Sequence, residues 1–130
     1  MINAYLDTSA AMKLIVEEPE SDALSRELTS RQDRRLVAPW LLHTEMLCAA
    51  GRHPDAVDAA AVRAMLETVN LVDLTRGDLL AAGTHSPLRS NDAIHLAVAL
   101  RAGCEEMVTY DEELAAAAAA AGLSVLAPGR

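Results

Sequence analysis

The sequence Asn91-Asp92-Ala93-Ile94-His95-Leu96-Ala97-Val98-Ala99-Leu100 decides the fold of this chain. After Asp92, every residue of the stretch except His95 is apolar, and no Gly or Pro interrupts it. The stretch therefore predicts a helix that is buried on most sides. The two residues before the acid, Ser90 and Asn91, are typical helix caps and would hold it at the N-terminal end of this helix.

A carboxylate beside a buried helix has to be compensated, because taking a charge out of water is costly. The simplest compensation for Asp92 is the helix dipole, whose positive end lies at the N-terminus. The alternative is that Asp92 joins other acids around a cation. The rest of the chain supplies further acids that the fold could bring to the same place.

The chain is acidic and nearly free of aromatic residues. Lys and Arg number 11 against 19 Asp and Glu, so the net charge is −8. This sign argues against a simple basic nucleic-acid binder, but not against an enzyme that reaches phosphates through a divalent metal. Hydrophobic residues make up 52% of the chain, enough for a real core, and the length predicts a single domain covering residues 1–130.

Neither the cysteines nor the N-terminus indicates export. Cys48 and Cys104 lie in apolar, helical contexts without CxxC spacing, so we predict buried reduced thiols. Asp7 interrupts the N-terminus too early for a signal peptide, and no apolar run reaches the roughly 18 residues of a membrane span. We therefore expect a soluble cytoplasmic protein that does not enter a membrane.

Short strands alternate with helices along the chain, which predicts a parallel sheet covered by helices on both faces. Thr8 and Ser9 are expected to cap the first helix, and residues 128–130 are expected to fray. The predicted strands are 3–6, 36–38, 71–74, 107–110 and 124–126. The predicted helices are 10–16, 19–30, 39–50, 56–69, 76–83, 93–102 and 111–121.

Two acids, Asp7 and Asp111, each follow a predicted strand and precede a helix. Open parallel sheets keep their binding sites at the carboxyl ends of the strands, so these carboxylates would face one crevice if their strands are neighbours. Asp92 begins the helix that leads into one of these strands. Glu45 lies inside an otherwise apolar helix and needs a partner. Four acids from four separate segments could thus meet at one edge.

Such a cluster would repel itself. Two carboxylates about 5 Å apart cost roughly 3 kcal/mol at an effective dielectric constant near 20. A hard divalent cation with oxygen ligands, Mg²⁺ or alternatively Mn²⁺, would remove this cost. Such an ion suits phosphodiester hydrolysis, because it activates and aligns a water and neutralises charge on the leaving oxygen. Acids also open helices in many proteins, so for any single one of them capping is the simpler interpretation.

Four segments, in this order and spacing, resemble the motifs of PIN-domain nucleases, and at this chain length those of VapC-type toxins from toxin–antitoxin pairs. The resemblance spans essentially the whole chain and implies a three-layer α/β/α domain with strand order 3-2-1-4-5. It also implies an Mg²⁺- or Mn²⁺-dependent endoribonuclease, a hydrolase, that forms a homodimer and binds a VapB-type antitoxin. The segments are Tyr5-Leu6-Asp7-Thr8-Ser9-Ala10, His43-Thr44-Glu45-Met46-Leu47, Asn91 to Ala97, and Val108-Thr109-Tyr110-Asp111-Glu112-Glu113-Leu114.

Position by position, the acidic quartet of the family corresponds to Asp7, Glu45, Asp92 and Asp111. The resemblance implies that Asp7 and Asp92 are the direct metal ligands and that the other two complete the shell, directly or through water. Ser9 matches a frequent small hydroxyl residue near the site. Many relatives carry a further acidic or polar residue a few positions after the last acid. Here the corresponding positions, Ala115 to Ala118, offer none, which leaves a second metal position in doubt.

Several residues have a structural interpretation beside the functional one. His95 is predicted to be a core or interface histidine that donates to a neighbour, rather than a metal ligand or base. Arg89 could contact an RNA phosphate or be an ordinary surface residue.

Two other functions remain open at this stage. A phosphoryl-accepting receiver-like domain also has an acidic pocket, but it would need a lysine late in the chain, and Lys13 is the only lysine. The other alternative is a catalytically inactive PIN-like module whose acids dock an arginine-rich partner.

Overall fold

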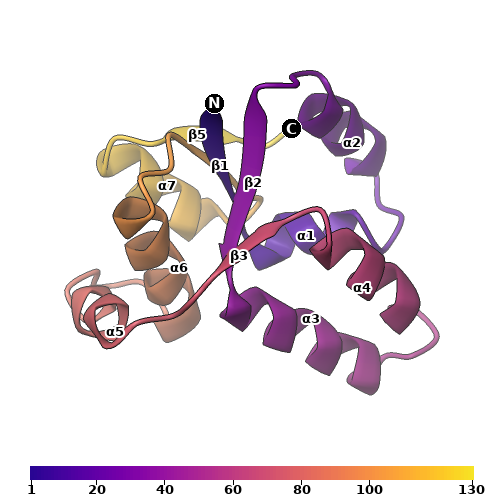
Figure 1. Ribbon diagram of the computed structural model, residues 1–130, viewed down its shortest axis with the longest axis horizontal. Helices are drawn as coiled ribbons and strands as arrows, with labels where there is room; N and C mark the ends of the chain where they lie inside the picture. Colours follow the sequence, from indigo (N-terminus) through magenta and orange to yellow (C-terminus); the bar gives the residue numbers. More distant parts are fainter.

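Five parallel strands form one sheet in the order β3-β2-β1-β4-β5, as the computed structural model of residues 1–130 shows (Figure 1). The strand order and the α/β class expected from the resemblance are confirmed. Each strand lies close to its predicted position. The strands are β1 (Ile2–Leu6), β2 (Arg34–Pro39), β3 (Asn70–Val72), β4 (Glu106–Val108) and β5 (Ser124–Leu126).

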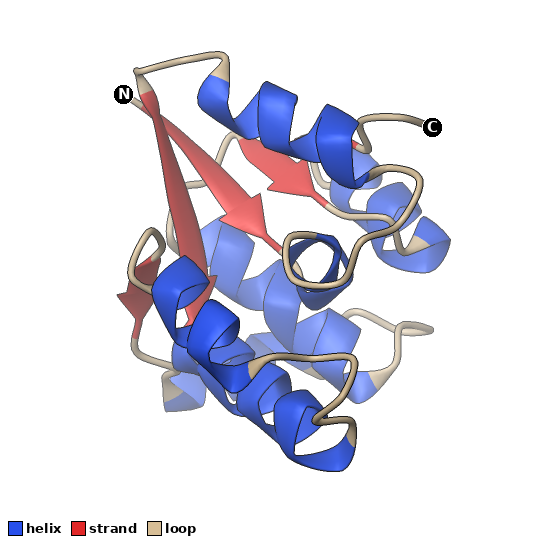
Figure 2. Cartoon of the chain, turned by 90° about the vertical axis from the view of Figure 1, so that its right-hand side faces the viewer, coloured by secondary structure: helices blue, strands red, loops and turns tan.

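Helices cover both faces of the sheet, with the first four on one side and the last three on the other (Figures 1 and 2). This gives the three layers predicted from the alternation of strands and helices. The helices are α1 (Thr8–Lys13), α2 (Ser21–Thr29), α3 (Trp40–Arg52), α4 (Ala59–Leu66), α5 (Arg76–Ala82), α6 (Ser90–Arg101) and α7 (Glu112–Ala120).

The central strand β1 is buried on both faces, and its side chains alternate between two cores. Ala4 and Leu6 pack in the larger core, under α1 to α4. Tyr5 points the other way, into the core under α6 and α7, where it packs with residues such as Leu96 and Met107. Because successive side chains of a strand face opposite sides, β1 joins the two cores and fixes where its last residue, and hence Asp7, emerges.

The predicted buried helix is present as α6, but its cap differs from the expected one. His95 and the run from Leu96 to Ala99 are buried. The N-cap residue is Arg89, without a side-chain cap bond, so Ser90 and Asn91 lie in the first turn. The expected end at Gly103 is confirmed, because this glycine adopts φ +69°, a conformation that side chains with a Cβ rarely take.

The predicted cap of the first helix is also wrong. Asp7 is the N-cap residue of α1, and Thr8 and Ser9 lie inside the first turn. Their hydroxyls donate to side chains instead, Thr8 to Glu45 and Ser9 to Asp7. A hydroxyl that bonds a carboxylate is not available to cap a helix, and local sequence could not reveal that competition.

Three further expectations require correction. Cys104 is buried as predicted, but Cys48 is exposed, because it lies on the outer side of α3. The helix predicted for 56–69 runs only from Ala59 to Leu66, since the Asp58 carboxylate accepts from the Ala60 N–H and starts it later. The C-terminus does not fray, because Arg130 forms an ion pair with Glu20 at 2.8 Å.

No helix of the structure is both long and apolar enough to cross a membrane.

The α5 helix is attached to α6 by polar contacts. Asp78 and Thr75 form a capping box at its start. The buried Asp78 carboxylate also accepts from the Arg101 guanidinium at 2.6 and 3.0 Å. Burial by itself would raise the pKa of Asp78, but the bonds from Arg101 and Thr75 outweigh it and hold the pKa below its ordinary value.

Replacing Asp78 by Ala removes both the cap and the ion pair, so we expect a loss of about 2 kcal/mol in the free energy of unfolding. A group whose pKa is lowered by folding stabilises the protein above its unfolded pKa, and that contribution is lost as the pH falls through the folded pKa. The difference between wild type and Asp78→Ala in urea unfolding should therefore shrink below about pH 4. The exposed neighbour Asp73 provides a control, and an equal loss for Asp73→Ala would contradict this account.

Candidate functional site

Two of the predicted acids lie at the same edge because their strands are neighbours. Asp7 follows the last residue of β1, and Asp111 lies three residues beyond the end of β4. The two strands are parallel, with Leu6 opposite Val108. The carboxyl ends of adjacent parallel strands meet at one edge, so the expected meeting of these two segments is confirmed.

Asp7 is buried and held by two hydroxyl groups. Its Oδ2 atom accepts from Thr109 Oγ1 at 2.5 Å and from Ser9 Oγ at 2.7 Å. Both hydroxyls are themselves fixed by backbone N–H groups of the loop that follows β4, those of Tyr110 and Asp111. The Asp7 carboxylate therefore has a defined orientation, with Oδ1 left without a partner.

Asp92 lies in the first turn of α6 and faces the other two acids. It is half-buried, and its pKa is raised above the ordinary value. Burial is the largest cause, and the negative charges of Asp111 and then Asp7 raise the pKa further. Asp92 lines a pocket of about 370 Å³ together with Asp111, Arg89 and Arg130. Asp111 and Asp7 thus lie near enough to Asp92 for their negative charges to raise its pKa.

Glu45 approaches from α3 and is held by three donors. Its Oε1 atom accepts from Thr8 Oγ1 at 2.9 Å and lies 2.8 Å from His95 Nε2. Its Oε2 atom has one longer contact, 3.3 Å from Asn91 Nδ2. Burial works to raise the pKa of Glu45, but the bonds from His95, Thr8 and Asn91 outweigh it and lower that pKa. Glu45 is therefore ionised near neutral pH.

Each of the four carboxylates keeps at least one oxygen that the protein does not tightly bind. Asp7 has Oδ1 free, and Glu45 has Oε2 only weakly engaged. Asp111 uses Oδ1 to cap α7 by accepting from the Leu114 N–H, which leaves Oδ2. No buried side-chain oxygen lacks a partner, so the free oxygen of Asp7 reaches solvent. The hydrogen bonds orient the acids without using up their ligating capacity.

The chemistry of these donors fits a hard divalent cation, because carboxylate and hydroxyl oxygens are the ligands that Mg²⁺ and Mn²⁺ prefer. As the side chains stand, no three His, Cys, Asp or Glu residues form a group that could hold a metal ion.

Sequence reasoning missed four residues that orient the acids. His95 is the buried donor to a neighbour that we predicted. Ser9 and Arg89 lie at the site, Ser9 hydrogen-bonded to Asp7 and Arg89 lining a pocket with Asp92. The motif segments contain all the missed residues, but hydroxyl, phenol and amide groups carry no distinctive local signal. The missed residues are Tyr5, Thr8, Asn91 and Thr109.

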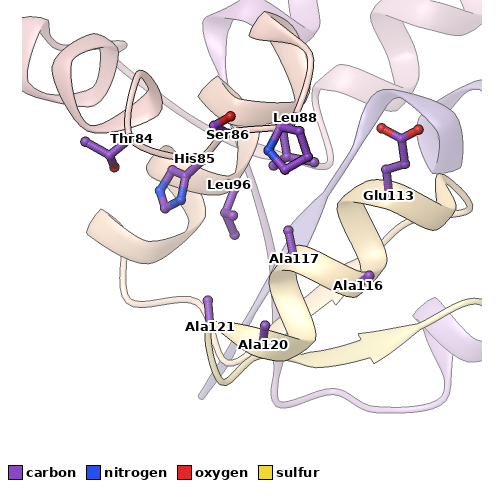
Figure 3. A pocket seen from close by; sticks show the side chains of 11 residues that line it. Thr84, His85, Ser86, Leu88, Leu96, Glu113, Ala116, Ala117, Ala120 and Ala121 are labelled. Atoms are coloured by element: carbon purple, nitrogen blue, oxygen red, sulfur yellow. The ribbon is translucent and has the colours of Figure 1, made fainter.

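A larger pocket of about 810 Å³ lies beside the acidic edge rather than on it. Figure 3 shows it between the loop of residues 84–88 and the alanine-rich face of α7, with Leu96 of α6 at its floor. Glu113 stands at one end and also lines the acidic pocket, so the two hollows adjoin. The alanines leave this space because their side chains are too short to fill it.

Comparisons with known proteins agree with this arrangement. The family model described as "PIN domain" matches residues 4–120. Ribonuclease VapC46 of Mycobacterium tuberculosis is 39% identical, covering 98% of this chain and 99% of that protein. Ribonuclease VapC35 of the same organism is 40% identical, covering 97% of each.

Solved structures share the fold at lower sequence identity. VapC20 of M. tuberculosis, described as a toxin that cleaves the sarcin–ricin loop, superposes with a TM-score of 0.71 at 17% identity, covering 96% of this chain and 99% of that one. VapBC-1 of Haemophilus influenzae gives 0.68 at 18% identity, covering 96% and 97%. Fold, order of acids and relatives lead to one conclusion: the chain belongs to the PIN-domain family and, within it, to the VapC ribonucleases.

Proposed function

We propose that this protein is an Mg²⁺-dependent endoribonuclease, with Mn²⁺ as an alternative ion, and that it acts as the toxin of a toxin–antitoxin pair. One observation carries the proposal. Asp7 and Asp111 lie at the ends of paired strands, Asp92 lines a pocket with Asp111, and each of the three acids keeps an oxygen that is not hydrogen-bonded by the protein. A hydrolase of phosphodiester bonds needs such a set of oxygens.

In this proposal Asp7 and Asp92 hold the ion directly, and Glu45 and Asp111 complete its shell, directly or through water. When bound, a divalent ion lowers the pKa of a water and neutralises charge on the leaving oxygen. The chain itself supplies orientation, because the hydroxyls of Ser9 and Thr109 keep Asp7 in place. In the same proposal, Ser9 also contacts the RNA substrate.

Positive charge for the RNA backbone is available on the rim of the acidic pocket. Arg89 is exposed at the start of α6 and close enough to Asp92 to oppose the rise of its pKa. It is not engaged in an ion pair, so we propose that it contacts an RNA phosphate. Local positive charge of this kind lets an acidic protein bind a polyanion next to its own carboxylates.

The names of the relatives support the toxin assignment. Two relatives at 39% and 40% identity are called ribonucleases, and similar structures include VapBC assemblies from H. influenzae and Rickettsia felis. We therefore propose a VapB-type antitoxin as partner, a homodimer as the assembly and the cytoplasm as the place of action. An antitoxin arginine that meets the carboxylates would inhibit by taking the place of the metal charge.

The two alternatives fare differently. A receiver-like domain is disfavoured by the sheet, since flavodoxin-like proteins have strand order 2-1-3-4-5. A receiver-like domain would also need a lysine beside the acidic pocket. Lys13, the only lysine, instead forms ion pairs with Glu18 and Glu20. An inactive module that docks an arginine-rich partner would use the same acids without a metal, so metal dependence separates it from a nuclease.

Replacing Asp92 by Asn, or Asp7 by Ala, should abolish RNA cleavage and toxicity while the protein stays folded. Each change removes a proposed ligand, and an amide or methyl group cannot replace its charge. Cleavage of labelled RNA in excess Mg²⁺ and growth after induced expression measure the effect, with circular dichroism as the fold check. The exposed Asp22 of α2 gives the control Asp22→Asn, which should keep full activity. A fully toxic Asp92→Asn protein would refute the assignment.

The metal-free protein should lose stability as the pH rises, and Mg²⁺ should restore it. Asp92 has a raised pKa in the folded state, so the native fold favours its protonated form. The resulting penalty is absent below the unfolded pKa, near 3.9, and grows as the pH passes through the higher folded value. Near pH 7 and with chelator, Asp92→Asn should therefore melt above wild type. Added Mg²⁺ should raise the wild-type melting temperature but not that of the variant.

An inactive docking module predicts a different outcome for the same melts. Its carboxylates repel one another in the same way, so both hypotheses predict the same melting temperatures for wild type and Asp92→Asn in chelator. Mg²⁺ would not stabilise it, because its acids would not form a metal site. Equal melting temperatures of wild type with Mg²⁺ and with chelator would favour this module.

A further inference from the structure

A buried chain of polar groups connects the central strand to the acidic edge. Tyr5 of β1 is fully buried, and its hydroxyl lies 2.6 Å from Nδ1 of His95, which is 1% exposed. The other ring nitrogen, Nε2, lies 2.8 Å from Glu45 Oε1. The two rings meet edge to face, with centroids 5.6 Å apart. Burying two polar groups in an apolar core is costly, so this arrangement needs a reason.

The hydrogen bonds between Tyr5, His95 and Glu45 determine which ring nitrogen of His95 carries the hydrogen. The Tyr5 phenol keeps its proton near neutral pH, since an ordinary phenol has a pKa of about 10. Its only hydrogen-bond partner is Nδ1, and with the ring hydrogen on the nitrogen that faces Glu45, the hydroxyl donates and Nδ1 accepts. A ring nitrogen that accepts carries no proton, and Nε2 faces a carboxylate oxygen that can only accept, so the ring hydrogen resides on Nε2. The Nε2–H group then donates to Glu45.

This donor determines how Glu45 is oriented. Oε1 accepts from both His95 and Thr8, at 2.8 and 2.9 Å, and so is committed to the protein. Oε2 has only the 3.3 Å contact with the exposed Asn91, the residue next to Asp92. The carboxylate is thus turned so that its less engaged oxygen lies toward the N-terminal end of α6.

We propose that His95 is a positioning residue: Tyr5 holds it as an Nε2–H donor, and this donor fixes Glu45 with Oε2 available to the reaction. The inference rests on the proposed function, because Glu45 belongs to the proposed metal shell. It assigns a role to two residues, Tyr5 and His95, that touch neither the ion nor the RNA. Outer-shell donors of this kind typically change metal affinity or activity by about 10- to 100-fold.

The competing interpretation is that His95 only fills space beneath α6. A space-filling histidine has no required tautomer, and an apolar side chain of similar volume would replace it. A positioning histidine depends on its donor and acts only through Glu45. These differences can be measured separately.

The first experiment uses the metal-free wild-type protein with ¹⁵N-labelled histidine, followed by NMR near pH 7.5. His95 is assigned by the signal that disappears in His95→Gln. The expected result is a protonated Nε2 with a slowly exchanging hydrogen and an unprotonated Nδ1, and in Tyr5→Phe this hydrogen should exchange faster. A proton on Nδ1, or on both nitrogens, would overturn the proposal.

The second experiment measures Mn²⁺ affinity by calorimetry and kcat for RNA cleavage. His95→Leu should weaken both by at least about tenfold, whereas His95→Gln, whose amide can still donate, should retain most of each. In a Glu45→Ala background, His95→Leu should cause no further loss of Mn²⁺ affinity. The exposed His53 supplies the control His53→Gln, which should match wild type. Equal losses with and without Glu45 would overturn the proposal.

Tyr5→Phe decides the question if the His95 variants do not fold. It keeps the aromatic ring and removes only the donor, so folding should survive, Mn²⁺ affinity should fall and the control should not change. Unchanged affinity in a folded Tyr5→Phe protein would overturn the proposal. Failure of the proposed function looks different, since wild type would then neither bind Mn²⁺ nor cleave RNA while the NMR result for His95 could still be as expected.

Discussion

Repulsion between carboxylates at one edge of the sheet is the constraint on which the rest of the site depends. Asp7 and Asp111 are brought together by neighbouring parallel strands, and α6 adds Asp92. Neighbouring negative charges oppose folding unless a positive charge or a bound proton offsets their repulsion. The fold can hold them only because the elements that carry them are anchored elsewhere, in the two cores on either side of β1.

The polar residues around the acids orient them and leave oxygens free. Thr109 and Ser9 bind one oxygen of Asp7, and a backbone N–H binds one oxygen of Asp111. Full satisfaction of these carboxylates by the protein would stabilise the metal-free fold but would leave nothing for a ligand. Leaving some oxygens unbound reduces the stability of the free protein, which is common where a site is built for binding.

The central strand has a double role in this arrangement. Its last residues pack in both cores, and the residue that follows is the most buried of the four acids. Tyr5 contributes a phenol that reaches His95, and through it the strand is linked to Glu45 on α3. One five-residue strand therefore precedes Asp7 directly and supports Glu45 through Tyr5 and His95, so an error in its packing would affect both acids.

By itself, the sequence determined the elements and the identity of the acids. The apolar run of α6 predicts burial because its residues are apolar on nearly all sides, and strands followed by Asp place carboxylates at strand ends. These are local properties, so one sequence was enough for them. The strand order and the family were implied by the resemblance of four motifs to those of PIN-domain nucleases.

Only the tertiary structure decided how each acid is held. That Thr8 and Ser9 bond carboxylates instead of capping a helix, and that Tyr5 and His95 support Glu45, depends on contacts between residues up to 90 positions apart. Short polar side chains bond whichever partner the fold places nearest, and no local pattern encodes that choice. Likewise, Cys48 lies in an apolar, helical stretch of sequence, which predicted burial. It is exposed because packing of α3 against the sheet decides which face of the helix is buried.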